Sequence, residues 1–238
     1  SDTYFAAQRN IVTEITQKAG QKCTAIRRIL VPESLVDSLQ EALIAELDRV
    51  VVGDPRADGV TMGPLATASQ LQDYRDGVSL LTKEASVVYG STESVADKGY
   101  FAAPVLLRAE DGGGEAVHTH EVFGPVATLI PYDGSAATAA DLVARGGGSL
   151  ACSVYSNDKA FLGALLPELL THNGRVLVVD KKVSDTATGH GMVLPQLNHG
   201  GPGRAGGGSE LGALRGLQFY MQRSAVQGNK ALIERILS

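Results

Sequence analysis

The stretch 13-TEITQKAGQKCTAIRRILVP-32 decides the fold, because its pattern changes from helical to extended around one cysteine. Residues 4–19 carry apolar side chains at helical spacing, and Gly20 ends the helix that they predict. Residues 25–31 are rich in β-branched and apolar side chains and predict a strand. Cys23 is therefore expected in a short turn between a helix and a strand.

The rest of the chain alternates between helical and extended patterns. Helices are expected at 33–50, 66–85, 136–144, 159–170 and 230–237, and strands at 86–89, 103–107, 126–132, 150–155 and 175–179. Strands that alternate with helices are typical of parallel sheets. The sequence thus predicts an α/β fold, with an open, mostly parallel twisted sheet and helices on both faces.

The composition is that of a soluble globular protein of 238 residues, with 44% hydrophobic and 20% charged side chains. The net charge of −5 and the absence of a basic stretch make nucleic-acid binding a poor default. No apolar run predicts a membrane span, and the first residues do not resemble a secretion signal. The two cysteines suit a reducing cytoplasm and have no zinc-ligand spacing, so no metal site is expected.

Cys23 is the leading candidate nucleophile. A thiol in a turn before a strand can have free backbone N–H groups around it, and the nearby cations Lys22, Arg27 and Arg28 would favour its thiolate form. The competing interpretation is that a lone cysteine is a small buried apolar residue. That interpretation is retained for Cys152, which lies in an apolar strand.

Glycines are abundant, 28 in all, and they cluster at 112–114, at 146–148 and in the loop 199-HGGPGRAGGG-208. Glycine N–H groups can surround a phosphate, but this loop matches no phosphate-binding pattern. A flexible surface loop is the favoured interpretation of the segment. The alternative is a wall of a substrate channel in which Arg204 meets a coenzyme A phosphate, with His199 in a structural role.

Two segments resemble signatures of the aldehyde dehydrogenase superfamily. The Gly-Gln-x-Cys element at 20–23 is similar to the family's cysteine motif, and 121-EVFGPV-126, about a hundred residues later, resembles its Glu-x-Phe-Gly-Pro signature. The ending at 189–228 is most similar to the aldehyde dehydrogenase part of the bifunctional ring-opening enzymes of phenylacetate degradation. It is also similar to the semialdehyde dehydrogenases of the coenzyme A-dependent benzoate ring-fission route.

The resemblance implies an oxidation that uses NADP or NAD and converts a coenzyme A-linked semialdehyde to an acid. Cys23 would attack the aldehyde carbon to give a thiohemiacetal and then a thioester, and its own N–H would stabilise the oxyanion. Glu121 would bind the nicotinamide ribose, and Phe123 would lie beside the nicotinamide ring. The residues expected to border the substrate channel are Gln21, Lys22, Thr24 and Arg204.

The resemblance also implies a division of the chain. Residues 1–216 correspond to the nucleophile-bearing catalytic domain, and 217–238 to a C-terminal tail with a possible oligomerisation strand. The family's cofactor-binding domain, its general base and half of its oxyanion hole have no counterpart here. We therefore expect the chain to need that domain as a partner, to form homo-oligomers and to have little activity alone.

Three further points stay open at this stage. Asp180 stands where the superfamily usually has asparagine, which suggests a different local hydrogen bond. A non-catalytic binding or assembly module is the alternative function. An acyl-transferring cysteine enzyme is disfavoured, because the segment around Glu121 and Phe123 resembles a nicotinamide contact that acyl transfer does not need.

Overall fold

A computed structural model describes residues 2–194, 197–207, 214–222 and 224–237, and residues 1, 195–196, 208–213, 223 and 238 of the segments discussed above lie outside them. The helices are α1 (Asp2–Thr16), η1 (Gln17–Gly20), η2 (Glu33–Leu35), α2 (Val36–Leu47), α3 (Ala68–Leu81), α4 (Glu115–Thr119), α5 (Ala136–Ala144), α6 (Lys159–His172), η3 (Gly203–Ala205), α7 (Leu214–Phe219) and α8 (Lys230–Leu237). The strands are β1 (Arg28–Pro32), β2 (Ala85–Tyr89), β3 (Val105–Ala109), β4 (Val126–Tyr132), β5 (Ser149–Tyr155) and β6 (Asn173–Val179).

The strands form two sheets in the described part of the chain. A four-stranded sheet has the order β1-β4-β3-β2, in which β1, β4 and β3 are parallel and β2 is antiparallel at the edge. Strands β5 and β6 pair in parallel as a second, two-stranded sheet. The expectation of a mostly parallel α/β arrangement is confirmed, and the described strands are divided between two sheets.

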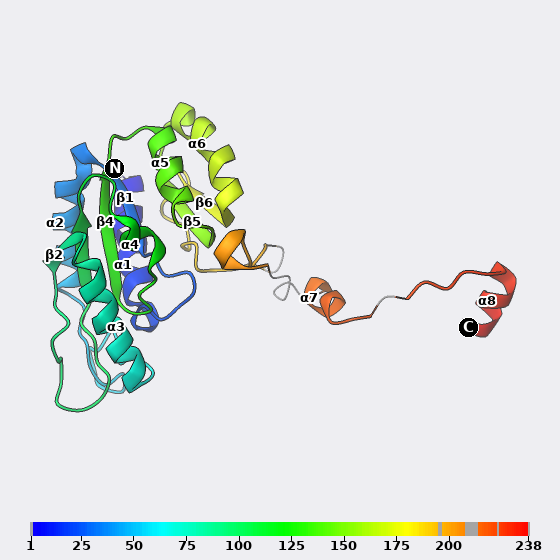
Figure 1. Cartoon of the computed structure of the whole chain (residues 1–238), viewed down its shortest axis with the longest axis horizontal. Helices are drawn as coiled ribbons and strands as arrows, with labels where there is room; N and C mark the ends of the chain where they lie inside the picture. The colour runs from blue at the N-terminus through cyan, green and yellow to red at the C-terminus, as the bar shows by residue number, and fades with distance from the viewer. Residues whose placement is uncertain (1, 195–196, 208–213, 223, 238) are drawn as a thin grey trace.

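Helices cover both faces of the larger sheet, as expected (Figure 1). Helices α1 and α2 pack on one face, where Ile15 and Leu43 contact the cluster that contains Leu129 of β4. Helices α3, α4, α5 and α6 contribute to the core on the other face, which contains Ile130 of the same strand. Neighbouring residues of a strand point to opposite faces, so β4 is buried on both sides.

Close backbone contacts explain the glycine clusters. A Cβ atom on Gly174, at the start of β6, would overlap the Gly200 carbonyl, and one on Gly148 would overlap the Pro202 carbonyl. The Arg204 N–H also donates to a carbonyl of the 146–148 cluster. The loop at 199–207 is therefore packed against the amino ends of β5 and β6 at the surface of the protein.

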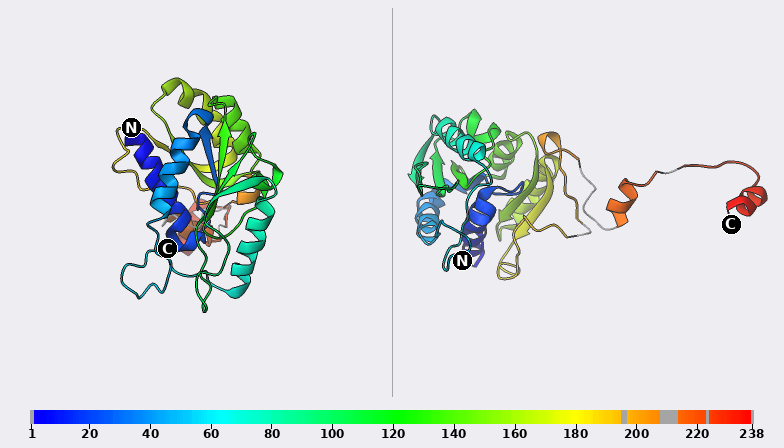
Figure 2. Two further views of the ribbon diagram at one scale, coloured as in Figure 1. Left: turned by 90° about the vertical axis from the view of Figure 1, so that its left-hand side faces the viewer. Right: turned by 90° about the horizontal axis from the view of Figure 1, so that it is seen from below.

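The tail extends away from the body of the molecule. Helices α7 and α8 lie to one side of it in Figure 1 and in the right-hand view of Figure 2. Residues 217–219, where a strand was considered, belong to α7, and the described residues between α7 and α8 form no strand. No helix in the described ranges combines the length and apolarity that a membrane crossing requires.

Candidate active site

Cys23 is exposed in the turn that separates η1 from β1. Three consecutive residues before it, Lys18, Ala19 and Gly20, have left-handed backbone angles, with φ of 55°, 52° and 69°. This conformation costs roughly 1–2 kcal/mol for each residue that has a Cβ, so other contacts must hold it. No described residue accepts a hydrogen bond from the Cys23 N–H, which leaves that donor for a ligand. Residues 20–24 are called the cysteine turn below.

Arg27 joins the cysteine turn to the segment 121–125, which is called the glutamate segment. Its guanidinium donates to the Gly20 carbonyl and to the Gly124 carbonyl, with both N···O distances 2.8 Å. Its Nε lies 3.8 Å from Glu121 Oε1, and its Cζ lies 5.5 Å from the centre of the Phe123 ring. Burial lowers the pKa of Arg27, and the Glu121 carboxylate raises it. One side chain thus brings the two signatures together.

The two segments also touch through their backbones. A Cβ atom on Gly20 would overlap the carbonyl group of Gly124, so only glycine fits there. A Cβ atom on Gly124 would lie 2.7 Å from the ring of Tyr74, a buried side chain of α3. The first glycine of Gly-Gln-x-Cys and the glycine of Phe-Gly-Pro are therefore explained by one close contact, between Gly20 and Gly124.

A groove of about 990 Å³ brings together most of the predicted site residues. Its wall is formed by parts of α1, the cysteine turn, β1, the glutamate segment and β5. The predicted site residues that line it are Cys23, Thr24, Glu121, Phe123 and Arg204. The Glu121 side chain is 48% exposed and Phe123 is 41% exposed. A carboxylate and an aromatic face that line the same groove as a thiol suit the hydroxyl groups and the planar ring of a nicotinamide nucleoside.

The other two predicted channel residues do not line this groove. The Gln21 side chain accepts a hydrogen bond from the Ala66 N–H at 2.9 Å. The Lys22 ammonium forms a 2.8 Å ion pair with Glu14 of α1 and also donates to Gln17 at 2.7 Å. Both side chains therefore hold the cysteine turn in place. Lys22 bonds Glu14 and Gln17, and Arg27 bonds the two carbonyls described above, so neither cation is bonded to the Cys23 sulfur.

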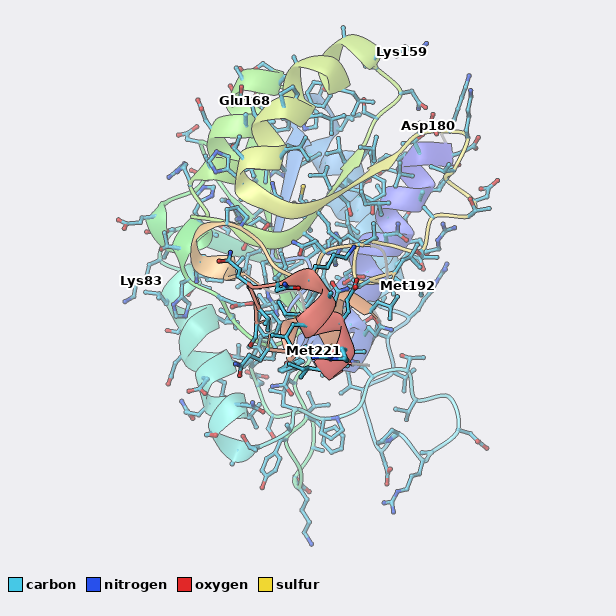
Figure 3. All side chains as sticks on the ribbon, turned by 90° about the vertical axis from the view of Figure 1, so that its right-hand side faces the viewer. Lys83, Lys159, Glu168, Asp180, Met192 and Met221 are labelled. Atoms are coloured by element: carbon cyan, nitrogen blue, oxygen red, sulfur yellow. The ribbon has the colours of Figure 1, made fainter. Side chains whose placement is uncertain are left out.

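Behind the turn lies a buried histidine that the sequence did not single out. His190 Nε2 donates to the Thr24 carbonyl at 2.5 Å, and its Nδ1 lies 2.7 Å from the Ser153 hydroxyl. A carbonyl only accepts, so Nε2 carries the proton and Nδ1 accepts from Ser153. Desolvation lowers the pKa of His190, and the Thr24 carbonyl and the nearby Glu14 carboxylate raise it. This neutral imidazole fixes the carbonyl next to the nucleophile. In Figure 3, Asp180 marks the end of β6, and Met192 lies two residues after His190.

A second histidine contacts the nucleophile itself. His199 Nε2 lies 3.7 Å from Cys23 Sγ, and His199 Nδ1 lies 3.2 Å from Nη1 of Arg175 on β6. Burial lowers the pKa of Arg175, and the Cys23 sulfur raises it. The cation nearest to the thiol along this path thus comes from β6, a strand far along the sequence.

Two further expectations concern loop residues. Arg204 donates to the Thr119 carbonyl at 2.6 Å and is otherwise exposed at the groove. Asp180 accepts a hydrogen bond from the Lys182 N–H at 2.9 Å, which closes a turn after β6. The expectation that Asp180 makes a different local hydrogen bond from that of the family's asparagine stays a prediction.

Cys152 differs sharply from Cys23. Burial raises the pKa of the Cys152 thiol to about 12, although the nearby Arg28 lowers it. Arg28 itself is directed into the core, where it donates to the Leu142 carbonyl at 2.7 Å and contacts His118 Nδ1 at 2.9 Å. Arg28 thus has no recorded contact with the Cys23 sulfur, and Cys152 remains a packing residue, as expected.

A model of the aldehyde dehydrogenase family matches residues 4–226, which include the cysteine turn and the glutamate segment. The chain belongs to the aldehyde dehydrogenase family. Two structures of other aldehyde dehydrogenases share its fold. The 1-pyrroline-5-carboxylate dehydrogenase of Thermus thermophilus has a TM-score of 0.80 at 23% identity, over 94% of this chain and 41% of the other. Betaine aldehyde dehydrogenase from Staphylococcus aureus, solved with NAD+, has a TM-score of 0.76 at 26% identity, over 91% and 41%.

Two curated relatives are more similar in sequence. The 3,4-dehydroadipyl-CoA semialdehyde dehydrogenase of Aromatoleum evansii is 44% identical over 203 residues, which cover 82% of this chain and 39% of the relative. Protein MaoC of Klebsiella aerogenes is 40% identical over 177 residues, which cover 74% of this chain and 52% of MaoC. The chain thus spans about half or less of the length of these two relatives.

Sequence reasoning placed Cys23, Glu121 and Phe123 through the two signatures. It did not find the clamp formed by Arg27 or the two histidine contacts, because these join positions that are distant along the chain. His199 was taken as structural, and its only sequence signal was its place beside the glycine-rich loop.

Proposed function

We propose that this chain is the thiol-bearing half of a dehydrogenase that oxidises a coenzyme A-linked semialdehyde to the acid with NADP or NAD. The observation that carries the proposal is the Arg27 clamp, which sets the cysteine turn against the glutamate segment on one groove. The name of the Aromatoleum relative, at 44% identity, supports a semialdehyde attached to coenzyme A. We propose that this semialdehyde comes from the cleavage of an aromatic ring.

The thiol performs the bond-forming step. The Cys23 thiolate attacks the aldehyde carbon, a C–S bond forms, and the carbonyl π electrons move to the oxygen. The Cys23 N–H, which no described residue uses, donates to that oxyanion. The resulting thiohemiacetal has the hydrogen that must leave as hydride before a thioester can form.

Glu121 and Phe123 orient the hydride acceptor. The Glu121 carboxylate would accept hydrogen bonds from the ribose hydroxyls, and Phe123, whose ring Arg27 covers on one side, would lie beside the nicotinamide. When bound, the nicotinamide supplies the acceptor for the hydride. Water then hydrolyses the thioester with the help of a base that we assign to the cofactor-binding domain.

The partners follow from this division of labour. We propose that the chain works with a cofactor-binding domain of the family type, in homo-oligomers and in the cytoplasm, where free thiols persist. The exposed Arg204 at the groove would bind a phosphate of coenzyme A. We propose the phenylacetate route as the source of the substrate, with the benzoate ring-fission route as the alternative.

The test is formation of reduced nicotinamide. The chain is assayed alone and as the product of its full reading frame, including any coding sequence upstream of Ser1, with a semialdehyde thioester and NADP or NAD. We expect turnover by the full product that Cys23→Ala abolishes and Cys152→Ala leaves within about twofold. Turnover that survives Cys23→Ala would remove Cys23 from the mechanism. A folded full product without turnover would favour a binding or assembly module.

A further inference from the structure

His199 lies between the nucleophile and a fixed cation. Its Nε2 is 3.7 Å from Cys23 Sγ, within the range of a hydrogen bond to sulfur, and its Nδ1 is 3.2 Å from Arg175 Nη1. Arg175 is held by two carbonyls, those of Asn198 at 2.7 Å and His190 at 2.9 Å. The three side chains therefore form a chain of contacts that ends on the sulfur.

The direction of these contacts follows from the donors available. A guanidinium has five N–H groups and no acceptor, so Arg175 donates to Nδ1. The single proton of a neutral imidazole must then reside on Nε2, and it faces the sulfur of Cys23. His199 is thus arranged as a donor to the thiolate and not as a base that removes the thiol proton.

The described part of the chain has a second example of this arrangement, in which the acceptor is unambiguous. Arg28 Nη1 lies 2.9 Å from His118 Nδ1, and His118 Nε2 lies 2.7 Å from the Gly112 carbonyl. A carbonyl has no proton to give, so His118 Nε2 must be the donor. His118 is therefore an example in this protein of a histidine that accepts from an arginine at Nδ1 and carries its proton on Nε2.

Other charged groups near the sulfur do not compete for this role. Lys22 and Glu14 form an ion pair with each other at 2.8 Å. His190 is neutral, with both ring nitrogens bonded to Thr24 and Ser153. Arg175 donates to Nδ1 of His199, so that nitrogen has no free lone pair for a second proton.

We propose that His199 is a catalytic residue whose Nε2–H hydrogen bond stabilises the Cys23 thiolate, and that Arg175 is a positioning residue that fixes the imidazole tautomer. The thiol proton leaves to solvent, and no oxidation or reduction occurs. On attack, the sulfur electron pair forms the bond to the aldehyde carbon and the hydrogen bond from His199 is given up. The attack of the thiolate on an aldehyde rests on the proposed function. The stabilisation of the thiolate by His199 does not.

The test is the pH dependence of alkylation in the full chain. The rate of iodoacetamide addition to Cys23 is followed by peptide mass spectrometry between pH 5.5 and 9.5, with circular dichroism to check folding. We expect His199→Phe to raise the pH midpoint by about one pH unit, a tenfold loss of thiolate at lower pH. We expect His199→Gln, which keeps an N–H donor, to recover most of the shift, and His172→Phe at the end of α6 to have no effect.

Arg175→Met separates the positioning role. With the tautomer released, we expect a pH midpoint for alkylation of Cys23 that lies between those of the wild type and His199→Phe. If Arg175→Met does not fold, the two His199 variants decide alone. An unchanged midpoint in His199→Phe overturns the proposal, and so does a shift that His199→Gln fails to recover. Either result leaves the dehydrogenase assay unaffected, and failure of that assay leaves the alkylation result intact.

Discussion

Arg27 shows how much of the site depends on one side chain. It donates to carbonyls of two segments about a hundred residues apart and covers one side of Phe123. A buried carbonyl that loses its donor costs free energy, on the order of 1–3 kcal/mol. The clamp is therefore both a structural and a functional contact, and the two effects can be separated by a conservative change.

Arg27→Lys keeps the charge but cannot bridge two carbonyls and cover a ring. We expect the free energy of unfolding to fall by about 1–3 kcal/mol and turnover of the full reading-frame product to fall at least tenfold. The matched control is Arg145→Lys, since the exposed Arg145 also bridges two carbonyls, those of Gly112 and Gly113. Urea unfolding measures the free energy of unfolding. Equal losses in both variants would show that the clamp has no special role.

The two thiols should differ in reactivity. Burial raises the pKa of Cys152 to about 12, so roughly one molecule in ten thousand has this thiolate at pH 8. We expect iodoacetamide to label Cys23 within minutes and to leave Cys152 unlabelled in the folded chain. Labelling of Cys152 after denaturation in guanidinium is the control. Comparable labelling of both thiols before denaturation would contradict the buried position of Cys152.

At this scale the sequence was a good guide to residues inside signatures and a poor guide to residues between them. Cys23 and Glu121 each belong to a recognisable string, so their proximity could be expected. His190 and His199 contact the turn from more than 160 positions away, and only the folded backbone brings them there. Lys22 was expected at the substrate channel, but a buried partner on α1 draws it away from the groove.

The element that positions the nucleophile is the turn between η1 and β1. It stands at the amino end of β1, and the glutamate segment stands at the amino end of the neighbouring β4. Because β1 and β4 are parallel, their amino ends lie at the same edge of the sheet, and the cysteine turn therefore meets the glutamate segment there. The sequence predicted β4 and α5 at their observed bounds, but β1 begins at Arg28 and not at residue 25, because pairing with β4 starts there.

Gly20→Ala tests this turn. Its φ of +69° disfavours any side chain, and a Cβ there would overlap the Gly124 carbonyl. We expect a loss of more than about 3 kcal/mol of unfolding free energy, or failure to fold. Gly59→Ala is the matched control, because Gly59 has φ of +81° but nothing within 4 Å of the added Cβ. That variant should lose only about 1–2 kcal/mol in thermal unfolding. Similar losses would mean that strain alone, without the close contact, explains Gly20.

On the scale of the whole molecule, the tail is the part least engaged with the rest. Leu232 and Ile236 lie four residues apart on α8 and are 46% and 70% exposed, and α8 lies away from the body in Figure 1. Residues four apart share one helix face, so these two form an apolar strip that burial against another copy would stabilise.

The tail should therefore mediate self-association of the chain. We expect dimers or larger species at tens of micromolar in light scattering, and a shift towards monomer in Leu232→Glu/Ile236→Glu. Leu170→Glu is the matched control, since Leu170 is 64% exposed on α6 of the body. Monomers at every concentration of the wild-type chain would contradict the role of the tail.

Global stability should depend on pH through His190. Desolvation lowers its pKa in the folded chain, whereas the unfolded chain restores the ordinary value near 6.5. Below that value the unfolded state binds a proton that the folded state excludes, so the stabilisation is complete above about pH 6.5 and is lost as the pH falls. The slope contributed by one such histidine is at most about 1.4 kcal/mol per pH unit.

The measurement is the free energy of unfolding in guanidinium at pH 7.5, 6.5 and 5.5. We expect His190→Gln, which can still donate to the Thr24 carbonyl, to be less stable at pH 7.5 but to lose less stability on acidification than the wild type. His118, whose pKa burial also lowers, retains its own contribution in that variant, so the dependence should shrink without vanishing. His172→Gln should keep the wild-type slope. If the pH dependence of the unfolding free energy is the same in His190→Gln as in the wild type, His190 can take a proton without disturbing the cysteine turn. The description of His190 as a neutral donor to the Thr24 carbonyl would then be wrong.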